Sequence, residues 1–268
     1  MQLKSFNDIT PDYQHIYLSP HFDDVVYSCG GSIGLQVSLG QRPLVITVFA
    51  GIPPSESKLG PFASKVHKLM GFGQDTAAAI AARRNEDANA ITYLHADYLW
   101  LDYHDAIYRG TPAYYTGRRL VSGKYHRNDC WINKQLAQDL VTLHERLPNV
   151  TWYAPLAIGR HVDHQIVFSA VESLICLGAS VSFYEDFPYV TGARVLQKRL
   201  SELDHTLKPT LVEISQQFHL RQQAAGMYAS QVKINFGNKE MMHKLINSYT
   251  QSICPIEIGH VERYWTAG

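Results

Sequence analysis

Residues 15–24 have the sequence His-Ile-Tyr-Leu-Ser-Pro-His-Phe-Asp-Asp. The apolar run at 16–18 predicts a short buried strand, and Pro20 ends it because proline has no backbone N–H to donate to a sheet. His21, Asp23 and Asp24 follow at once. Ligands of open α/β sheets bind beyond the carboxyl ends of strands, so these side chains predict a functional site there.

The rest of the chain alternates between apolar runs and amphipathic segments. The small-residue segment 28–34 predicts the start of a packed helix that Gly40 closes. Further strands are predicted at 44–50, 98–101, 150–154, 181–184 and 211–214, and further helices at 76–94, 128–146, 161–178, 215–232 and 239–249. Residues 51–72, rich in proline and glycine, are predicted to form a long loop. The alternation indicates an α/β fold: a Rossmann-like, mostly parallel sheet with helices on both faces.

Composition is that of an ordinary globular protein, with 46% hydrophobic and 18% charged residues. The 24 Lys and Arg balance the 24 Asp and Glu, so no overall field favours nucleic acid or an anionic membrane. The first residues lack the apolar core of a signal peptide, and no apolar run is long enough for a membrane span. Four widely spaced cysteines predict reduced thiols. We therefore expect a cytoplasmic protein with one domain over residues 1–268, and the sequence leaves open whether it forms a homo-oligomer.

Two clusters of metal-binding or proton-transferring side chains follow predicted strands. One lies at residues 21–24, and the other is His161-Val162-Asp163-His164. The carboxyl ends of parallel strands share one edge of a sheet, so the two clusters can meet. Each cluster contains a pair of metal-capable residues three positions apart, a spacing at which both can face one point. Two histidines and one carboxylate leave a position open for water, which is typical of catalytic rather than structural zinc.

A metal held in this way has a known chemistry. It lowers the pKa of a bound water toward neutrality, so that this water becomes the nucleophile, and it polarises a carbonyl. Asp23, adjacent to Asp24 but pointing elsewhere, would be the general base that takes the proton. Each motif alone has an ordinary alternative, such as a hydrogen-bonded polar histidine or carboxylates that complement a helix N-terminus. Their joint placement at strand ends favours the metal site.

The two motifs also carry a family resemblance. Pro20-His21-Phe22-Asp23-Asp24 with the downstream His161-Val162-Asp163-His164 resembles the paired PHxDD and HxxH motifs of the PIG-L/LmbE-like family of zinc-dependent N-deacetylases. Residues 83–86 are similar to an R-x-x-E helix of that family, and residues 101–105 to a segment that ends in an Asp. Residues 184–189, 228–231 and 262–265 resemble motifs of a bacterial branch of the same family.

The resemblance implies a metal site with assigned ligands. Zinc, or another divalent metal, would lie on His21, Asp24 and His164, with Asp23 as the base. His161 would not be a ligand. It would be either the positively charged partner of the tetrahedral oxyanion or the acid that protonates the leaving amine.

The resemblance also implies roles around that site. Asp163 would orient a histidine, and Arg83 and Asp105 would hydrogen-bond hydroxyls of a sugar ring. For Arg83, an ordinary helix ion pair with Glu86 or Asp87 is the alternative.

One position departs from the family. Some sugar deacetylases of this family have a Tyr two residues before HxxH that grips the carbonyl oxygen, and here that residue is Gly159, followed by Arg160. Another group must then do this work, or the substrate differs. Arg160 could instead meet an anionic part of a substrate.

The expected function is removal of an N-acetyl, or other N-acyl, group from a small polar molecule such as an N-acetylglucosamine conjugate. One alternative is a Rossmann-like nucleotide-binding module, but Cys29 stands where its GxGxxG motif needs a glycine. The other is a non-catalytic carbohydrate-binding protein, against which Asp23 argues because binding alone needs no base beside a metal.

Overall fold

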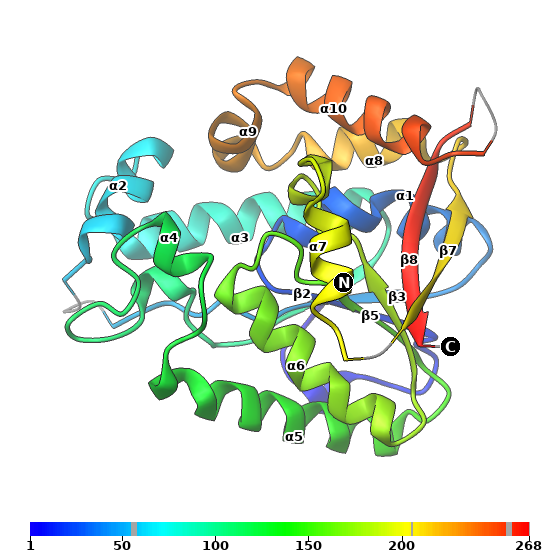
Figure 1. Ribbon diagram of the computed structural model, residues 1–268, viewed down its shortest axis with the longest axis horizontal. Helices are drawn as coiled ribbons and strands as arrows, with labels where there is room; N and C mark the ends of the chain where they lie inside the picture. Colours follow the sequence, from blue (N-terminus) through cyan, green and yellow to red (C-terminus); the bar gives the residue numbers. More distant parts are fainter. Residues whose placement is uncertain (55–57, 205, 256–258, 268) are drawn as a thin grey trace.

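A computed structural model describes residues 1–54, 58–204, 206–255 and 259–267 of the chain, and Figure 1 shows it as a ribbon. Its centre is an eight-stranded sheet with the strand order β1-β4-β3-β2-β5-β6-β8-β7. The strands are β1 Gln2–Leu3, β2 His15–Ser19, β3 Pro43–Thr47, β4 Asp97–Trp100, β5 Thr151–Pro155, β6 Ser180–Tyr184, β7 Leu207–Glu213 and β8 Val261–Ala267. Neighbours from β1 to β6 pair in parallel, and β8 runs antiparallel to β6 and β7. The predicted mostly parallel sheet is confirmed.

Helices cover both faces of this sheet (Figure 1). On one face α5 packs against α6, and on the other α1 packs against α8, with α3, α9 and α10 on that same side. The helices are α1 Asp24–Ser38, α2 Pro61–Met70, α3 Thr76–Tyr93, α4 Arg118–Val121, α5 Cys130–Arg146, α6 Val162–Cys176, α7 Val195–Ser201, α8 Phe218–Ala225, α9 Ala229–Phe236 and α10 Lys239–Ser252. Within the described ranges, none of them is long and apolar enough to cross a membrane.

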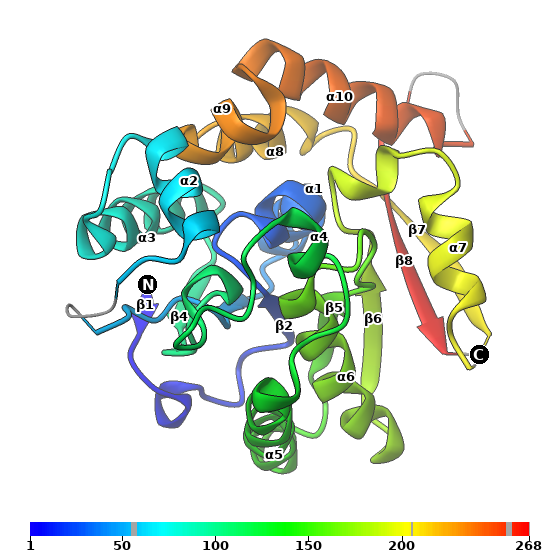
Figure 2. The same cartoon turned by 60° about the vertical axis from the view of Figure 1, so that its left-hand side comes forward.

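Strand β2 occupies the topological switch point of the sheet. The chain goes from β2 through α1 to β3 and then β4 on one side, whereas β5 and β6 lie on the other side of β2. The crossovers therefore diverge at the carboxyl end of β2, where doubly wound sheets bind their ligands. Figure 2 shows α2 and α4 in front of this region.

The glycines after β2 serve packing. They lie inside α1, where a Cβ on Gly31 would come 2.6 Å from Ile214 Cδ1 and one on Gly34 would come 2.6 Å from Leu220 Cδ2. Only glycine lets α1 approach the segment after β7 and α8 this closely. Because these residues are helical and covered, they form no turn that could cradle a pyrophosphate.

Two local predictions were wrong. The predicted loop at 51–72 contains α2, because Pro61 lies at its start and Gly71, with φ of 89°, ends it; both residue types are favoured at those positions of a helix. The predicted helix at 215–232 is two helices, α8 and α9, separated at Gly226–Tyr228. Strand β8 was not predicted at all, since its pairing with β6 and β7 is entirely long-range.

Candidate metal and active site

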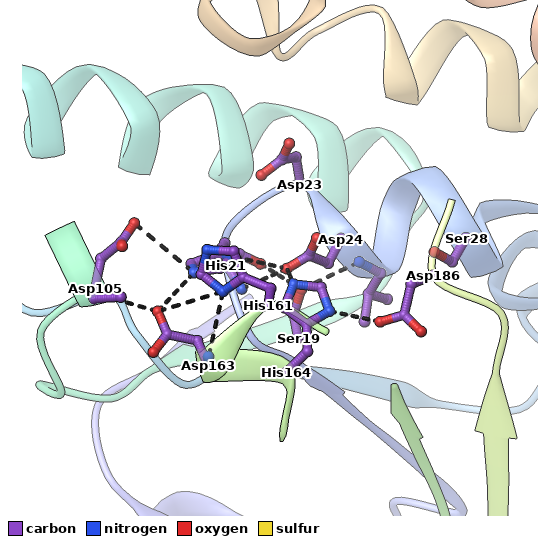
Figure 3. A network of polar contacts seen from close by, with 12 residues as sticks. Ser19, His21, Asp23, Asp24, Ser28, Asp105, His161, Asp163, His164 and Asp186 are labelled. Atoms are coloured by element: carbon purple, nitrogen blue, oxygen red, sulfur yellow. Dashed lines mark hydrogen bonds and ion pairs between the residues drawn. The ribbon is translucent and has the colours of Figure 1, made fainter. Parts of the chain in front are cut away.

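The two sequence clusters meet at one edge of the sheet (Figure 3). His21 follows β2, His161 and His164 follow β5, and the ring centroids of His21 lie 4.7 Å from His161 and 5.4 Å from His164. Asp105 arrives from the segment after β4 and Asp186 from the segment after β6. The shared strand direction therefore brings together side chains more than a hundred positions apart.

Asp24 lies between two imidazoles. Its Oδ2 atom is 3.1 Å from Nδ1 of His21 and 3.2 Å from Nε2 of His164, at the first turn of α1. The backbone N–H of His21 also donates to this oxygen at 2.8 Å. Three atoms of the kinds that bind zinc thus face one another in a buried space.

The other ring nitrogen of each imidazole faces a second carboxylate. Nε2 of His21 lies 3.0 Å from Asp163 Oδ2, and Nδ1 of His164 lies 2.5 Å from Asp186 Oδ1. Carboxylates placed in this way fix the tautomer and orientation of metal-binding histidines. Although burial alone would lower it, Asp24 and Asp186 raise the pKa of His164 to about 9.

The donor set fits a divalent cation. Nε2 of His164 is buried without a hydrogen-bond partner among the described residues, although Asp24 Oδ2 is close to it. When Nδ1–H of His164 donates a hydrogen bond to Asp186, Nε2 of the neutral ring carries a lone pair. This lone pair then faces the Asp24 carboxylate, and a cation between the two would stabilise both. Ring nitrogens of His21, His161 and His164 also lie within 4.8 Å of one another, so His161 is geometrically able to join the set.

Asp23 points away from Asp24 and is held by an arginine. Oδ1 of Asp23 accepts a hydrogen bond from Nη2 of Arg83 at 2.9 Å, and both side chains are buried. The pKa of Asp23 is raised by burial and by Asp24, while Arg83 opposes the rise. A carboxyl whose pKa is raised toward neutrality is suited to proton transfer at physiological pH. Nη1 of Arg83 also lies 3.8 Å from Asp105 Oδ2, so Arg83 faces Asp23 and Asp105 and not Glu86 or Asp87, the partners of the alternative helix ion pair.

His161 is the N-cap residue of α6. Its Nδ1 accepts a hydrogen bond from the backbone N–H of Asp163 at 3.3 Å, so a proton on the ring belongs on Nε2. Burial, followed by the neighbouring His21, lowers the pKa of His161 well below its usual value. The arrangement favours a neutral imidazole with an N–H donor.

Asp163 ends a chain of buried charges that the sequence did not reveal. Arg109 Nη1 lies 2.6 Å from Asp163 Oδ1, and Arg109 Nε lies 3.1 Å from Asp129 Oδ2. Arg109 stands in a Tyr- and Gly-rich segment without a distinguishing motif, and only the fold shows its partners. Asp186 lies within residues 184–189, which resemble a motif of the bacterial branch, but the resemblance predicted no role for it.

A pocket opens above these residues. It encloses about 950 Å³ including its open mouth, and its lining includes His21, Asp23, Asp24, Arg83, Asp105 and His161, with walls from α2, α4, α9 and Tyr189. Arg160 is absent from that lining. Its Nη1 lies 2.7 Å from Glu202 Oε1 beside a separate, smaller pocket near α7.

Known proteins match the chain at the level of sequence and of fold. The family model described as GlcNAc-PI de-N-acetylase (PIG-L) matches residues 16–175. The 2'-N-acetylparomamine deacetylase of Niallia circulans is 32% identical over 185 residues, which cover 65% of this chain and 66% of that protein. The protein of the same name from Streptomyces fradiae is 30% identical over 226 residues, covering 80% of this chain and 71% of that protein.

Among solved structures, the zinc-inhibited form of teicoplanin deacetylase Orf2 has a TM-score of 0.77 at 22% sequence identity, over 94% of this chain and 97% of that one. This likeness concerns the fold. The family match extends over more than half of the chain, from β2 to α6, and contains both clusters of the site. The chain therefore belongs to the GlcNAc-PI de-N-acetylase (PIG-L) family.

Proposed function

We propose that this chain is a zinc-dependent N-deacetylase that removes the acetyl group from a small N-acetylated amino-sugar conjugate. The observation that supports this most strongly is the position of Asp24 between His21 and His164, with Asp23 beside it in the same pocket. The names of the relatives, both 2'-N-acetylparomamine deacetylases, supply the substrate class.

His21, Asp24 and His164 would hold the ion. Asp24 is preferred over His161 as the third ligand because its oxygen lies within 3.2 Å of both imidazoles, whereas Nδ1 of His161 is used by a backbone N–H. A bound divalent cation would supply Lewis acidity to the acyl carbonyl and acidity to a water molecule. Asp163 and Asp186 would keep the two imidazoles oriented toward the ion.

Asp23 moves the proton. As the water oxygen bonds to the carbonyl carbon, Asp23 accepts a proton from that water. As the C–N bond breaks, the same carboxyl returns the proton to the leaving nitrogen, so that acetate and a free amine result. Arg83 keeps Asp23 in place through its 2.9 Å contact.

His161 stabilises the oxygen that becomes negative. Its Nδ1 is occupied by the N–H of Asp163, so Nε2–H is the group that it can offer to the tetrahedral intermediate. Of the two roles expected from the sequence, we therefore propose oxyanion stabilisation, in the form of a neutral hydrogen-bond donor rather than a cation.

The walls of the pocket suit a sugar. Asp105 and Arg83 line the pocket together with Tyr189, and a carboxylate and a guanidinium are groups that accept from and donate to the hydroxyls of a sugar ring.

The test measures metal and turnover in the same samples. Wild type, freed of metal with a chelator and then titrated with zinc, cobalt or manganese, should regain release of free amine from 2'-N-acetylparomamine or an N-acetylglucosamine conjugate at about one ion per chain. Higher zinc is included because a teicoplanin deacetylase has a zinc-inhibited form. Asp23→Asn should keep the metal and lose at least about 100-fold in kcat, while Asp139→Asn, outside the lining of the pocket, should change neither.

His164→Ala should lose the metal itself. If wild type binds metal and sugar but releases no amine from any N-acylated compound, the alternative of a carbohydrate-binding protein is correct. If no metal binds, the proposed site is wrong.

A further inference from the structure

Tyr189 lines the pocket, and its ring lies beside that of His164. The ring centroids of the two residues are 6.0 Å apart with an interplanar angle of 89°, so the edge of one ring meets the face of the other. Tyr189 lines the same pocket as Asp23, Asp24 and His161, and it is 39% exposed. Its hydroxyl has no hydrogen-bond partner among the described residues, which leaves it free for a ligand.

The turn that carries Tyr189 is tied to the site on two sides. Asp186, three residues earlier, faces His164 through Oδ1 and accepts the backbone N–H of Ile158 through Oδ2 at 2.8 Å. The backbone N–H of Val190 closes the turn by donating to the carbonyl of Asp186 at 3.0 Å. The backbone turn that carries Tyr189 is therefore anchored by the same residue, Asp186, that faces His164.

Gly159 makes room for this ring. A Cβ at position 159 would lie 2.8 Å from Cγ of Tyr189 and 2.9 Å from its Cδ1, and the glycine has φ of 84°, which side chains rarely adopt. A side chain at 159 and the ring of Tyr189 thus exclude each other. The space beside HxxH that a side chain at position 159 would fill is occupied by the ring of Tyr189, from the segment after β6.

The charges of the pocket decide which substrate atom Tyr189 faces. A carbonyl oxygen gains negative charge during attack, so it turns away from the Asp23 carboxylate and toward hydrogen-bond donors. Nε2 of His161 is one donor, and Tyr189, whose ring lies beside His164 and lines the same pocket, supplies a hydroxyl as a second one.

We propose that Tyr189 donates a hydrogen bond to the carbonyl oxygen of the acyl group and to the oxyanion that forms from it. This inference rests on the proposed deacetylase function. Gly159 has no side chain that could hydrogen-bond the carbonyl oxygen. The inference assigns this hydrogen bond to Tyr189, thirty positions later in the chain.

The kinetic test compares Tyr189→Phe with Tyr249→Phe. The control makes the same chemical change in a ring that packs on Phe187 but does not line the pocket. On an N-acetyl substrate, Tyr189→Phe should lower kcat about 100-fold with little change in KM, the usual cost of one oxyanion donor. On the N-trifluoroacetyl counterpart the loss should shrink to about 10-fold or less, because fluorine itself stabilises the oxyanion. An equal loss on both substrates, or a rise in KM alone, would show that Tyr189 contacts another part of the substrate.

A binding test does not depend on turnover. Methylphosphonate is a small tetrahedral mimic of the hydrated acetyl group, and its Kd for the zinc-loaded protein can be measured by calorimetry. Tyr189→Phe should raise this Kd about 10-fold, as expected for one lost hydrogen bond, and Tyr249→Phe should not. If wild type deacetylates nothing, the proposed function fails and this Kd alone decides the inference: no difference between the two variants overturns it. Zinc content and melting temperature must match wild type in both variants.

Discussion

Oδ1 of Asp186 lies 2.5 Å from Nδ1 of His164, on the opposite side of the imidazole from Asp24. Asp186 is not one of the proposed ligands, yet its contact favours a proton on Nδ1 of His164 and leaves Nε2 for the proposed ion. We expect Asp186→Asn to weaken zinc binding about 10-fold or more without removing a ligand, since partners behind metal-binding histidines have effects of this size. The measurement is competition for zinc with a chromogenic chelator.

Asp139→Asn is the matched control, because Asp139 is a partly exposed carboxylate that accepts hydrogen bonds from Gln135 and Tyr103 and does not line the pocket. An Asp186→Asn variant with unchanged zinc affinity would show that the orientation of His164 does not depend on this contact.

The contact of Arg83 with Asp23 predicts a pH effect. Burial and Asp24 raise the pKa of Asp23, and the Arg83 cation lowers it, so the removal of that charge must raise the pKa further. The proposed base, Asp23, can accept a proton only when it is deprotonated. The acidic limb of kcat/KM against pH should therefore move to higher pH by about one unit in Arg83→Gln, a typical effect of one nearby opposite charge.

Arg84→Gln offers a close control. Arg84 is the next residue of α3, but it binds the carbonyl of Ala50 and does not line the pocket. Its pH profile should equal that of wild type. If the pH profile shifted in both variants, or in neither, Asp23 would not be the base whose titration sets the acidic limb.

Arg109 is predicted to matter for stability. It is buried between Asp163 and Asp129, and its removal leaves two buried carboxylates without their cation. Against the effect of burial, Arg109 and His21 keep the pKa of Asp163 below its usual value, so this carboxylate is charged in the folded chain. Arg109→Met should lower the free energy of unfolding by about 3–5 kcal/mol, measured with urea on metal-free protein.

Arg160→Met removes an arginine from a more exposed pair, with Glu202, and should cost less than about 1 kcal/mol. Similar losses in the two variants would mean that the Arg109 cluster is no more tightly coupled than a surface ion pair.

The sequence predicted the centre of the site but not the residues behind it. His21, Asp24, His161 and His164 could be placed together because strand ends of a parallel sheet share one edge and because the spacing within each motif is local. Asp186 and Arg109 act on partners 22 and 54 positions away. No local pattern encodes such contacts, which depend on where β6 and the segment after β4 come to lie.

The same distinction holds for the fold. Helices α5 and α6 carry apolar stripes and α3 is rich in alanine, and these three and α10 were predicted near their true bounds. Strand β8 has no such independent signal. Its buried Glu262 accepts hydrogen bonds from the backbone N–H groups of Gly31 and Ser32, some 230 positions earlier in the chain. Proline and glycine predicted an interruption at 51–72, yet their placement at the two ends of α2 shows that they delimit a helix there.

The glycine-rich part of α1 supplies the last prediction. Alanine is intrinsically better than glycine inside a helix by about 1 kcal/mol, so Gly31→Ala would stabilise an isolated α1. In the folded chain its Cβ would lie 2.6 Å from Ile214 Cδ1 and 2.8 Å from Glu262 Oε1. Neither neighbour can move easily: Ile214 is fully buried, and Glu262 is held by Arg221 at 3.1 Å. Overpacking of this kind costs about 1–3 kcal/mol, which exceeds the gain in propensity.

Gly31→Ala should therefore unfold at lower urea than wild type, with a net loss of stability of up to about 2 kcal/mol after the propensity gain is subtracted. Gly117→Ala is the control, because no atom lies within 4 Å of its Cβ position and its φ of −175° is open to any residue. It should stay within about 0.5 kcal/mol of wild type, as surface substitutions usually do. If Gly31→Ala were as stable as Gly117→Ala, then α1 would not be held against Ile214 and Glu262 as closely as this packing requires. The position of Asp24 at the start of α1 would then need another cause.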